Sequence, residues 1–417
     1  MPTRSKAHSA DTPEAPTKQH ALALLDALKA VPAPLTTPQQ AEVFEELTRD
    51  LQDVLHGPFG EAIGDHALDE LLRVVTATFD AGKAKRSTDA ILFALKLLSY
   101  STSDATVDCI ARLAKANFAA DQFMWAVVLG AFGEGHPRAA DFFKALSKPL
   151  PEKFLAICLL DAANSAGRAG TLKSHPFNSP AGVKRLTEYL TNRKAASTSH
   201  AVSACGALPF ISAAARKRLY ALAVKHPSTE VRMEAGWAGA KAGDKAAVAF
   251  LTERCLDRTT SVQARTYLEE LGLTKRIPAE ALEPEFAAMA ELCAWLAHPN
   301  EFGQPPTKIE PLDHRTLYWP PTNDTRPVWL FRYTYSTGQH RAKPVHGVGM
   351  VGSMTWSFLD ETKPTMKPED LYGLHCCLEL EMNGDKRAPA KGSGKAGWAL
   401  ISKGPAARGK ARNKAKR

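Results

Sequence analysis

The sequence has 417 residues, of which 44% are hydrophobic and 23% are charged, and it predicts a folded chain of two or more packed units. No apolar run approaches the roughly 20 residues that a membrane-spanning helix needs, and the longest, residues 124–132, is far too short. The first residues include no apolar segment typical of a secretory signal, so we expect a cytoplasmic protein with no membrane partner.

The formal net charge of +9 is concentrated near the carboxyl end of the sequence. Residues 384–417 contain eleven Lys or Arg and one acid, which gives a net charge of +10, whereas the residues before them sum to −1. The segment is rich in Gly, Ala, Pro and Lys, and this composition predicts a disordered basic tail.

Two interpretations of the basic tail stay open. It is either a solubilising terminus or an arm that binds nucleic acid or acidic partners nonspecifically through cations such as Lys410, Arg412 and Lys414. An apolar island interrupts the tail at residues 398–401, beginning with Trp398, and has the character of a short docking segment.

Helical patterns fill most of the chain. Residues 1–18 are polar and aperiodic and predict a disordered segment. A helix is predicted to begin at Pro38, because Thr37 is a suitable N-cap residue and Gln40 completes a capping box. Apolar residues then recur at helical spacing without an intervening strand pattern, so we expect a helical domain over residues 19–300.

Internal similarity predicts how these helices pack. The segments that begin at Thr229 and Thr260 resemble each other and lie 31 residues apart, and a weaker copy begins at Thr198. A period near 30 residues is typical of a solenoid, in which each helix pair buries its apolar face against the next pair.

Residues 228–272 resemble a HEAT repeat of the short, phycobilisome-lyase type. The resemblance rests on a V-R-x-x-A-x-x-A helix that starts at Val231, a turn at Gly243 and Asp244, a second helix, and Asp257 near the next repeat. It implies an armadillo-like α-solenoid that acts as a protein-binding scaffold, and it does not imply lyase activity.

The composition changes after residue 300, where prolines break the helical pattern and aromatic residues become frequent. Residues 328–335 and 350–359 predict two strands, and Pro368 with the two acids that follow predicts a helix start. We therefore expect a small α+β domain over residues 301–383. A helical repeat domain followed by such a module resembles bacterial HEAT-repeat proteins of unassigned activity.

Three glycines, Gly347, Gly349 and Gly352, match the spacing G-x-G-x-x-G of a dinucleotide cradle. That cradle needs a helix after the glycines, whereas the residues that follow read as a strand. The spacing therefore favours a twisted or bulged strand, and we expect no cofactor.

The sequence His375-Cys376-Cys377 suggests either soft-metal ligation or a reactive thiol. Adjacent cysteines project in different directions from a helix, and the chain has no C-x-x-C spacing. A structural role is therefore favoured, and we expect no metal.

An aromatic and cationic cluster offers a further candidate interaction site. Trp319, Trp329, Arg332 and Tyr333 form a recognition surface if they are exposed. On a strand, Trp329, Phe331, Tyr333 and Tyr335 share one face, and four aromatic side chains on one side of a strand are more typical of a core.

We expect a non-enzymatic scaffold or adaptor that binds another protein on the concave face of the solenoid. The alternative is a nucleic-acid-binding protein that uses the basic tail, with binding that is lost at high salt. The −1 balance of the other residues disfavours a basic groove in the helical domain. An enzyme with its site between the helical and α+β domains is a third hypothesis.

Overall fold

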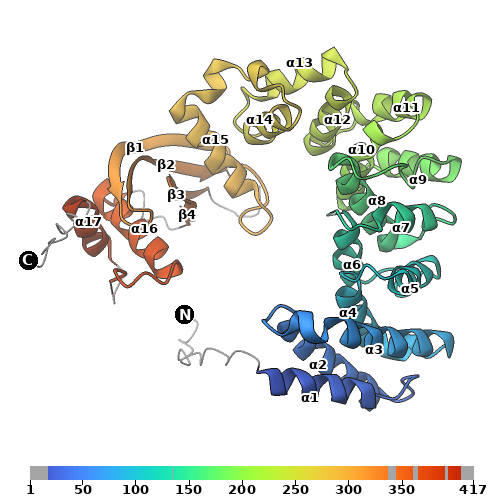
Figure 1. Ribbon diagram of the computed structural model, residues 1–417. Coiled ribbons are helices and arrows are strands. Elements are labelled where there is room, and N and C mark those ends of the chain that lie inside the picture. The colour runs from blue at the N-terminus through green and yellow to red at the C-terminus, as the bar shows by residue number, and fades with distance from the viewer. Residues whose placement is uncertain (1–16, 134, 337–343, 360–364, 390–392, 405–417) are drawn as a thin grey trace, which may run out of the picture. The chain divides into compact units, whose positions relative to one another are not determined.

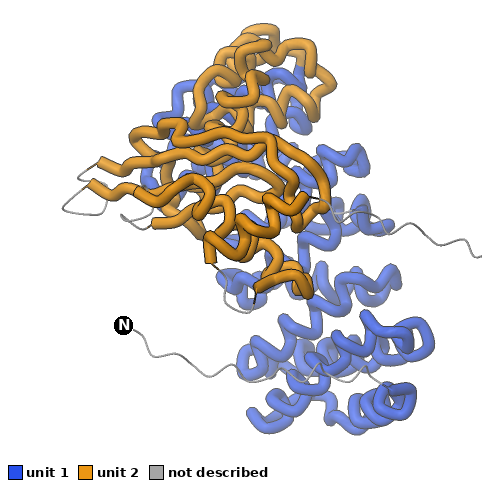
Figure 2. Tube along the Cα trace, turned by 90° about the vertical axis from the view of Figure 1, so that its left-hand side faces the viewer, with its two compact units in different colours: residues 1–242 blue, residues 243–417 orange. Residues whose placement is uncertain are grey.

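The chain divides into two compact units, residues 1–242 and 243–417 (Figures 1 and 2). The computed structural model describes residues 17–133, 135–336, 344–359, 365–389 and 393–404. The fold is mainly α-helical with a small α+β module near the carboxyl end, as the sequence predicts. None of the helices in the described residues is both long and apolar enough to cross a membrane.

Unit 1 consists of helices in close succession. Their bounds are α1 Lys18–Ala30, α2 Pro38–Leu55, α3 Gly60–Asp80, α4 Thr88–Leu98, α5 Asp104–Lys115, α6 Met124–Gly133, α7 Ala139–Ala145, α8 Lys153–Arg168, α9 Pro180–Thr191, α10 Thr198–Gly206, α11 Ala213–Ala223 and α12 Thr229–Lys241. The capping box predicted for α2 is confirmed: Gln40 N donates to Thr37 Oγ1 at 3.2 Å, and Thr37 N donates to Gln40 Oε1 at 3.1 Å. Helix α1 begins at Lys18, inside the segment predicted as disordered, whereas residues 1–16 lie outside the described residues.

The helices of unit 1 form two rows. Besides contacts between consecutive helices, each even-numbered helix from α2 to α10 contacts the next even-numbered one, and α1, α3, α5 and α7 are joined in the same way, as are α9 and α11. In Figure 1, from α3 to α12, the even-numbered helices lie on the left of the stack and the odd-numbered helices on the right. Each helix therefore buries its apolar stripe against near neighbours in the sequence.

Unit 2 contains three helices, a sheet and two further helices among its described residues. Their bounds are α13 Lys245–Arg254, α14 Ser261–Glu270, α15 Pro284–Ala297, β1 Lys308–Trp319, β2 Asp324–Tyr335, β3 Val345–Val351, β4 Thr355–Phe358, α16 Pro368–Met382 and α17 Gly394–Lys403. The four strands are antiparallel in the order β1-β2-β3-β4. Helix α15 packs on one face of the sheet, and α16 and α17 pack on the other.

Two predicted boundaries in this region need correction. The compact unit that holds the sheet starts at Gly243 and not at residue 301, because α15 contributes Leu292 and Leu296 to the core beneath the sheet. The predicted strand over residues 350–359 is interrupted by a turn at residues 352–354, which joins β3 to β4.

The prediction of a disordered tail from residue 384 is wrong over part of its length, because α17 is helical and packs on α16. Ser393 caps α17 by accepting from Ala396 N at 3.1 Å, and Ile401 is buried against α16 and the sheet. The apolar island therefore docks on its own chain. Residues 405–417 lie outside the described residues.

Candidate functional site

The aromatic residues proposed as a recognition surface are core residues. Trp329 and Tyr333 are buried beneath α15, and Trp319 is buried on the opposite face of the sheet. The interpretation as a core is confirmed, because side chains of alternate residues on β2 enter the two layers. Arg332 is exposed, and Trp398 is half-buried on α17. The remaining candidates, Lys410, Arg412 and Lys414, lie outside the described residues.

The glycine-rich segment is strand β3 and the turn after it, as the sequence favours. A Cβ atom on Gly349 would overlap the side chain of Leu292 in α15, and one on Gly347 would overlap the ring of Tyr333. These glycines allow a helix and an aromatic ring to approach the strand closely. The turn after these glycines leads directly into β4, not into a helix.

The His375-Cys376-Cys377 segment lies in α16 and is buried. Nε2 of His375 lies 3.6 Å from Oε2 of Glu379, which also accepts from Trp319 Nε1 at 2.8 Å and from Ser353 Oγ at 2.7 Å. Burial lowers the pKa of His375. Burial raises the pKa of Glu379, but the hydrogen bonds from His375, Ser353 and Trp319 outweigh it and bring that pKa below its usual value.

This buried cluster joins α16 to the sheet. In a catalytic triad the serine hydroxyl contacts the histidine, and the histidine contacts the acid. Here the Ser353 hydroxyl donates directly to Glu379, so the contacts do not follow that order. The described parts of the chain contain no group of three His, Cys, Asp or Glu side chains arranged to hold a metal ion.

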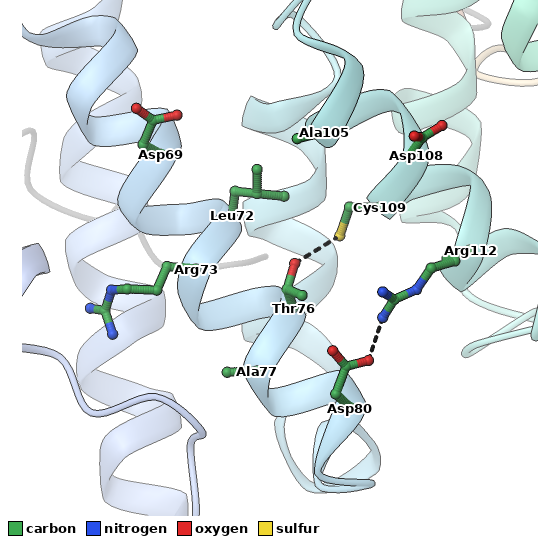
Figure 3. A pocket seen from close by; sticks show the side chains of 10 residues that line it. All are labelled: Asp69, Leu72, Arg73, Thr76, Ala77, Asp80, Ala105, Asp108, Cys109 and Arg112. Atoms are coloured by element: carbon green, nitrogen blue, oxygen red, sulfur yellow. Dashed lines mark hydrogen bonds and ion pairs between the residues drawn. The ribbon is translucent and has the colours of Figure 1, made fainter.

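A groove of about 630 Å³ lies between α3 and α5 (Figure 3). It is lined by three aspartates and two arginines, of which Asp80 and Arg112 form an ion pair across the seam. Thr76 Oγ1 lies 3.5 Å from Cys109 Sγ, and burial raises the pKa of that thiol. The charges that line the groove nearly balance, and burial disfavours the reactive thiolate form of Cys109. We therefore interpret the groove as the space between two packed helices.

Helix α6 is the centre of an exposed apolar surface on the even-numbered row. It carries no polar side chain, yet Val127 is 36% exposed, and Phe123 just before the helix is 74% exposed. The ring of Phe123 stacks on Phe154 of α8 with ring centroids 6.2 Å apart, and α4, which packs on α6, carries the half-buried Phe93. We call Phe93, Phe123, Val127, Ala131 and Phe154 the α6 face.

Polar residues border the α6 face. The guanidinium of Arg49 and the ammonium of Lys96 lie 4.6 Å and 5.0 Å from the centroid of the Phe93 ring. Lys96 Nζ also donates to Gln52 Oε1 at 2.7 Å. An apolar centre with a polar rim is the usual anatomy of a protein-binding surface.

A buried polar network fixes the row beyond α6. Arg168 of α8 forms an ion pair with Glu234 of α12 and stacks on Trp237, with its guanidinium carbon 3.6 Å from the ring centroid. Asn164 Nδ2 donates to the carbonyl of Ser203 at 2.8 Å, and its Oδ1 lies 3.1 Å from Nε2 of His175. Helices α8, α10 and α12 are thereby held in register.

The sequence matches no protein-family model, and no curated protein matches it. The resemblance to HEAT repeats therefore stays a prediction, although α10, α12 and α14 begin at Thr198, Thr229 and Ser261, close to the predicted period. Sequence reasoning missed Phe123 and Val127, and the uninterrupted apolar run of residues 124–132 was the signal that pointed to them.

Proposed function

We propose that this chain is a non-enzymatic scaffold of the HEAT-like kind and that the α6 face holds another protein. The observation that supports this proposal is the exposure of Val127 on a helix that has no polar side chain. A helix that is apolar on all sides is normally covered on all sides. An uncovered apolar patch with a polar rim is typical of a site that a partner covers.

The partner's chemistry follows from the α6 face and its rim. Phe123 and Val127 are exposed on a surface built of parallel helices. Such a surface suits an amphipathic helix whose large apolar side chains pack against these two residues. Lys96 contacts an amide and an aromatic ring, so its positive charge is not neutralised by these partners and favours an acidic residue beside the partner's apolar stripe.

The test compares two valine substitutions of the same kind. Val127→Asp places a carboxylate in the α6 face, whereas Val43→Asp places one on α2, where Val43 is 51% exposed. A partner recovered on the immobilised full chain is identified, purified and titrated by calorimetry. We expect Val127→Asp to weaken binding at least about tenfold, because it charges the centre of the interface, and Val43→Asp to leave it unchanged.

Equal affinity of the purified partner for both variants and the wild type would exclude the α6 face as the binding site. Self-association is measured in parallel by sedimentation. A dimer of this chain that Val127→Asp dissociates would show that a second copy occupies the face, and it would contradict a partner of another kind.

A further inference from the structure

Charge is strongly segregated along unit 1, which the sum of −1 over residues 1–383 conceals. Residues 42–80, in α2 and α3, contain ten acids and two arginines, a net charge of −8. Residues 135–242 contain sixteen Lys or Arg and six acids, a net charge of +10. The two regions lie at opposite ends of the helical stack in Figure 1.

The positive end is concentrated on α9, α11 and the loops that follow them. Residues 184–232 contain nine cations and two acids. We call these cations the basic surface: Lys184, Arg185, Arg193, Lys194, Arg216, Lys217, Arg218, Lys225 and Arg232. Six of them are exposed, and Arg185, Arg216 and Arg232 are half-buried.

Contacts between the loops bring these cations together in space. Helices α9 and α11 pack side by side. Arg193, just after α9, donates to the carbonyl of Lys225, just after α11, at 3.4 Å. Arg232 of α12 donates to the carbonyls of His226 and Pro227, both at 2.8 Å. The cations of the loops after α9 and α11 and of the first turn of α12 therefore lie close together.

The basic surface keeps its charge. Among the described residues, none of its nine cations has a carboxylate within ion-pair distance, and four of its five arginines instead donate to backbone carbonyls, as Arg185 does to Pro151 at 2.6 Å. In the other half of unit 1, three arginines pair with carboxylates, namely Arg49 with Glu45, Arg73 with Glu70 and Arg112 with Asp80. Oriented cations without carboxylate partners are suited to bind an external anion.

We propose that the basic surface binds the sugar–phosphate backbone of double-stranded DNA. Several cations on adjacent helices match the dense, regular charge of a duplex, and the acidic end of the stack repels it, so the duplex is directed to α9–α12. Four of the nine cations are lysines, which are depleted in protein–protein interfaces. Single strands are usually held by exposed aromatic platforms, whereas Tyr189 of α9 and Tyr220 of α11 are half-buried.

This site differs from the basic tail and from the α6 face. The experiment therefore uses three full-length variants, each lacking four positive charges, so that net charge is matched. The surface variant carries Lys194→Gln, Lys217→Gln, Arg218→Gln and Lys225→Gln. The tail variant carries Arg408→Gln, Lys410→Gln, Arg412→Gln and Lys414→Gln. The control carries Lys83→Gln, Lys85→Gln, Arg86→Gln and Lys115→Gln, all exposed in the other half of unit 1.

Binding of a fluorescent 20-base-pair DNA duplex is measured by anisotropy between 50 and 200 mM salt. For contacts with four or five phosphates we expect a slope of log affinity against log salt of about −4 for the wild type. The surface variant should bind at least about tenfold more weakly at 100 mM salt, with a slope nearer zero by about 3. The control should bind like the wild type.

Wild-type affinity in the surface variant would overturn the proposal, and a loss confined to the tail variant would assign binding to the tail. A single strand or polyglutamate that binds the wild type more tightly than the duplex would also overturn it. Circular dichroism of all variants separates loss of binding from loss of folding. Equal weakening of the surface and control variants would indicate a general charge effect and contradict a site on α9–α12.

Discussion

Gly373 of α16 and Gly397 of α17 lie in direct backbone contact, and a Cβ atom on Gly397 would overlap the carbonyl group of Gly373. The two helices approach this closely because neither residue has a side chain. The contact brings Trp398 to the ring of Tyr372, with centroids 6.5 Å apart, and seats Ile401 in the core. The backbone contact therefore explains why so short a helix stays docked.

The first prediction concerns this contact. Gly397→Ala should destabilise unit 2 by about 1–3 kcal/mol, because the added methyl group forces the helices apart. Gly130→Ala is the matched control: Gly130 lies in α6 with free space around its Cβ position, so alanine should stabilise by about 0.5–1 kcal/mol. Urea unfolding measures both changes. A Gly397→Ala variant as stable as the wild type would contradict the close packing, as would unchanged proteolysis at Lys395 and Lys403.

The second prediction concerns Arg168, which ties α8 to α12. Arg168→Ala leaves the buried Glu234 carboxylate without its ion pair and uncovers Trp237, so it should cost about 2–3 kcal/mol of unfolding free energy. Arg49→Ala is the control, because Arg49 also pairs with a glutamate and stacks on an aromatic ring but has a 58% exposed side chain. It should cost under about 1 kcal/mol. Similar costs for the two variants would contradict a structural role for the buried pair.

Local patterns explain which parts of the fold the sequence predicts. The capping box of Thr37 and Gln40 lies within four residues, so it specifies the start of α2 without help from the rest of the chain. The aromatic residues at alternate positions, Trp329, Phe331 and Tyr333, predict one buried face of β2 for the same reason. Local hydrogen bonds and side-chain periodicity depend only on residues that are close together in the sequence.

Other features depend on distant residues and leave no local pattern. The docking of α17 rests on backbone contact at glycines, so its composition resembles that of a disordered tail. Val127 is exposed because the neighbouring helices α4 and α8 do not cover that side of α6. The sequence of α6 alone resembles that of a fully buried helix. The sum of −1 over residues 1–383 disfavoured a basic groove in the helical domain, because the acids of α2 and α3 cancel the cations of the basic surface in that sum.

The third prediction is a loss of stability of unit 1 in mild acid. His175 is buried, its Nδ1 accepts from Phe177 N at 3.3 Å, and its Nε2 lies 3.1 Å from Asn164 Oδ1, which suits the neutral ring. Burial lowers the pKa of His175 from 6.5 to about 3. The unfolded state therefore binds more protons between these values, so this contribution is complete above pH 6.5 and is lost as pH falls toward 3.

Between pH 6.5 and 5, this histidine should lower the unfolding free energy by about 2 kcal/mol. Urea unfolding of wild type and His175→Gln at both values measures the effect. The variant should be less stable at pH 6.5 but lacks the titration, so the difference in unfolding free energy between the two proteins should be smaller at pH 5. A difference in unfolding free energy that is the same at both pH values would mean that His175 has a similar pKa in the folded and unfolded states.

The fourth prediction concerns the cysteines, which are all free and buried. Desolvation raises the pKa of Cys376 and that of Cys158 to about 12, and it raises the pKa of the neighbouring Cys377. Because the thiolate is the reactive form, a disulfide reagent at pH 8 should label the native chain slowly and should label all seven thiols in urea. Purified protein should contain no stoichiometric zinc. Rapid native labelling of Cys376 or Cys377, or zinc that protects them, would show that the His375 segment is a reactive or metal-binding site and that its burial in α16 is not structural alone.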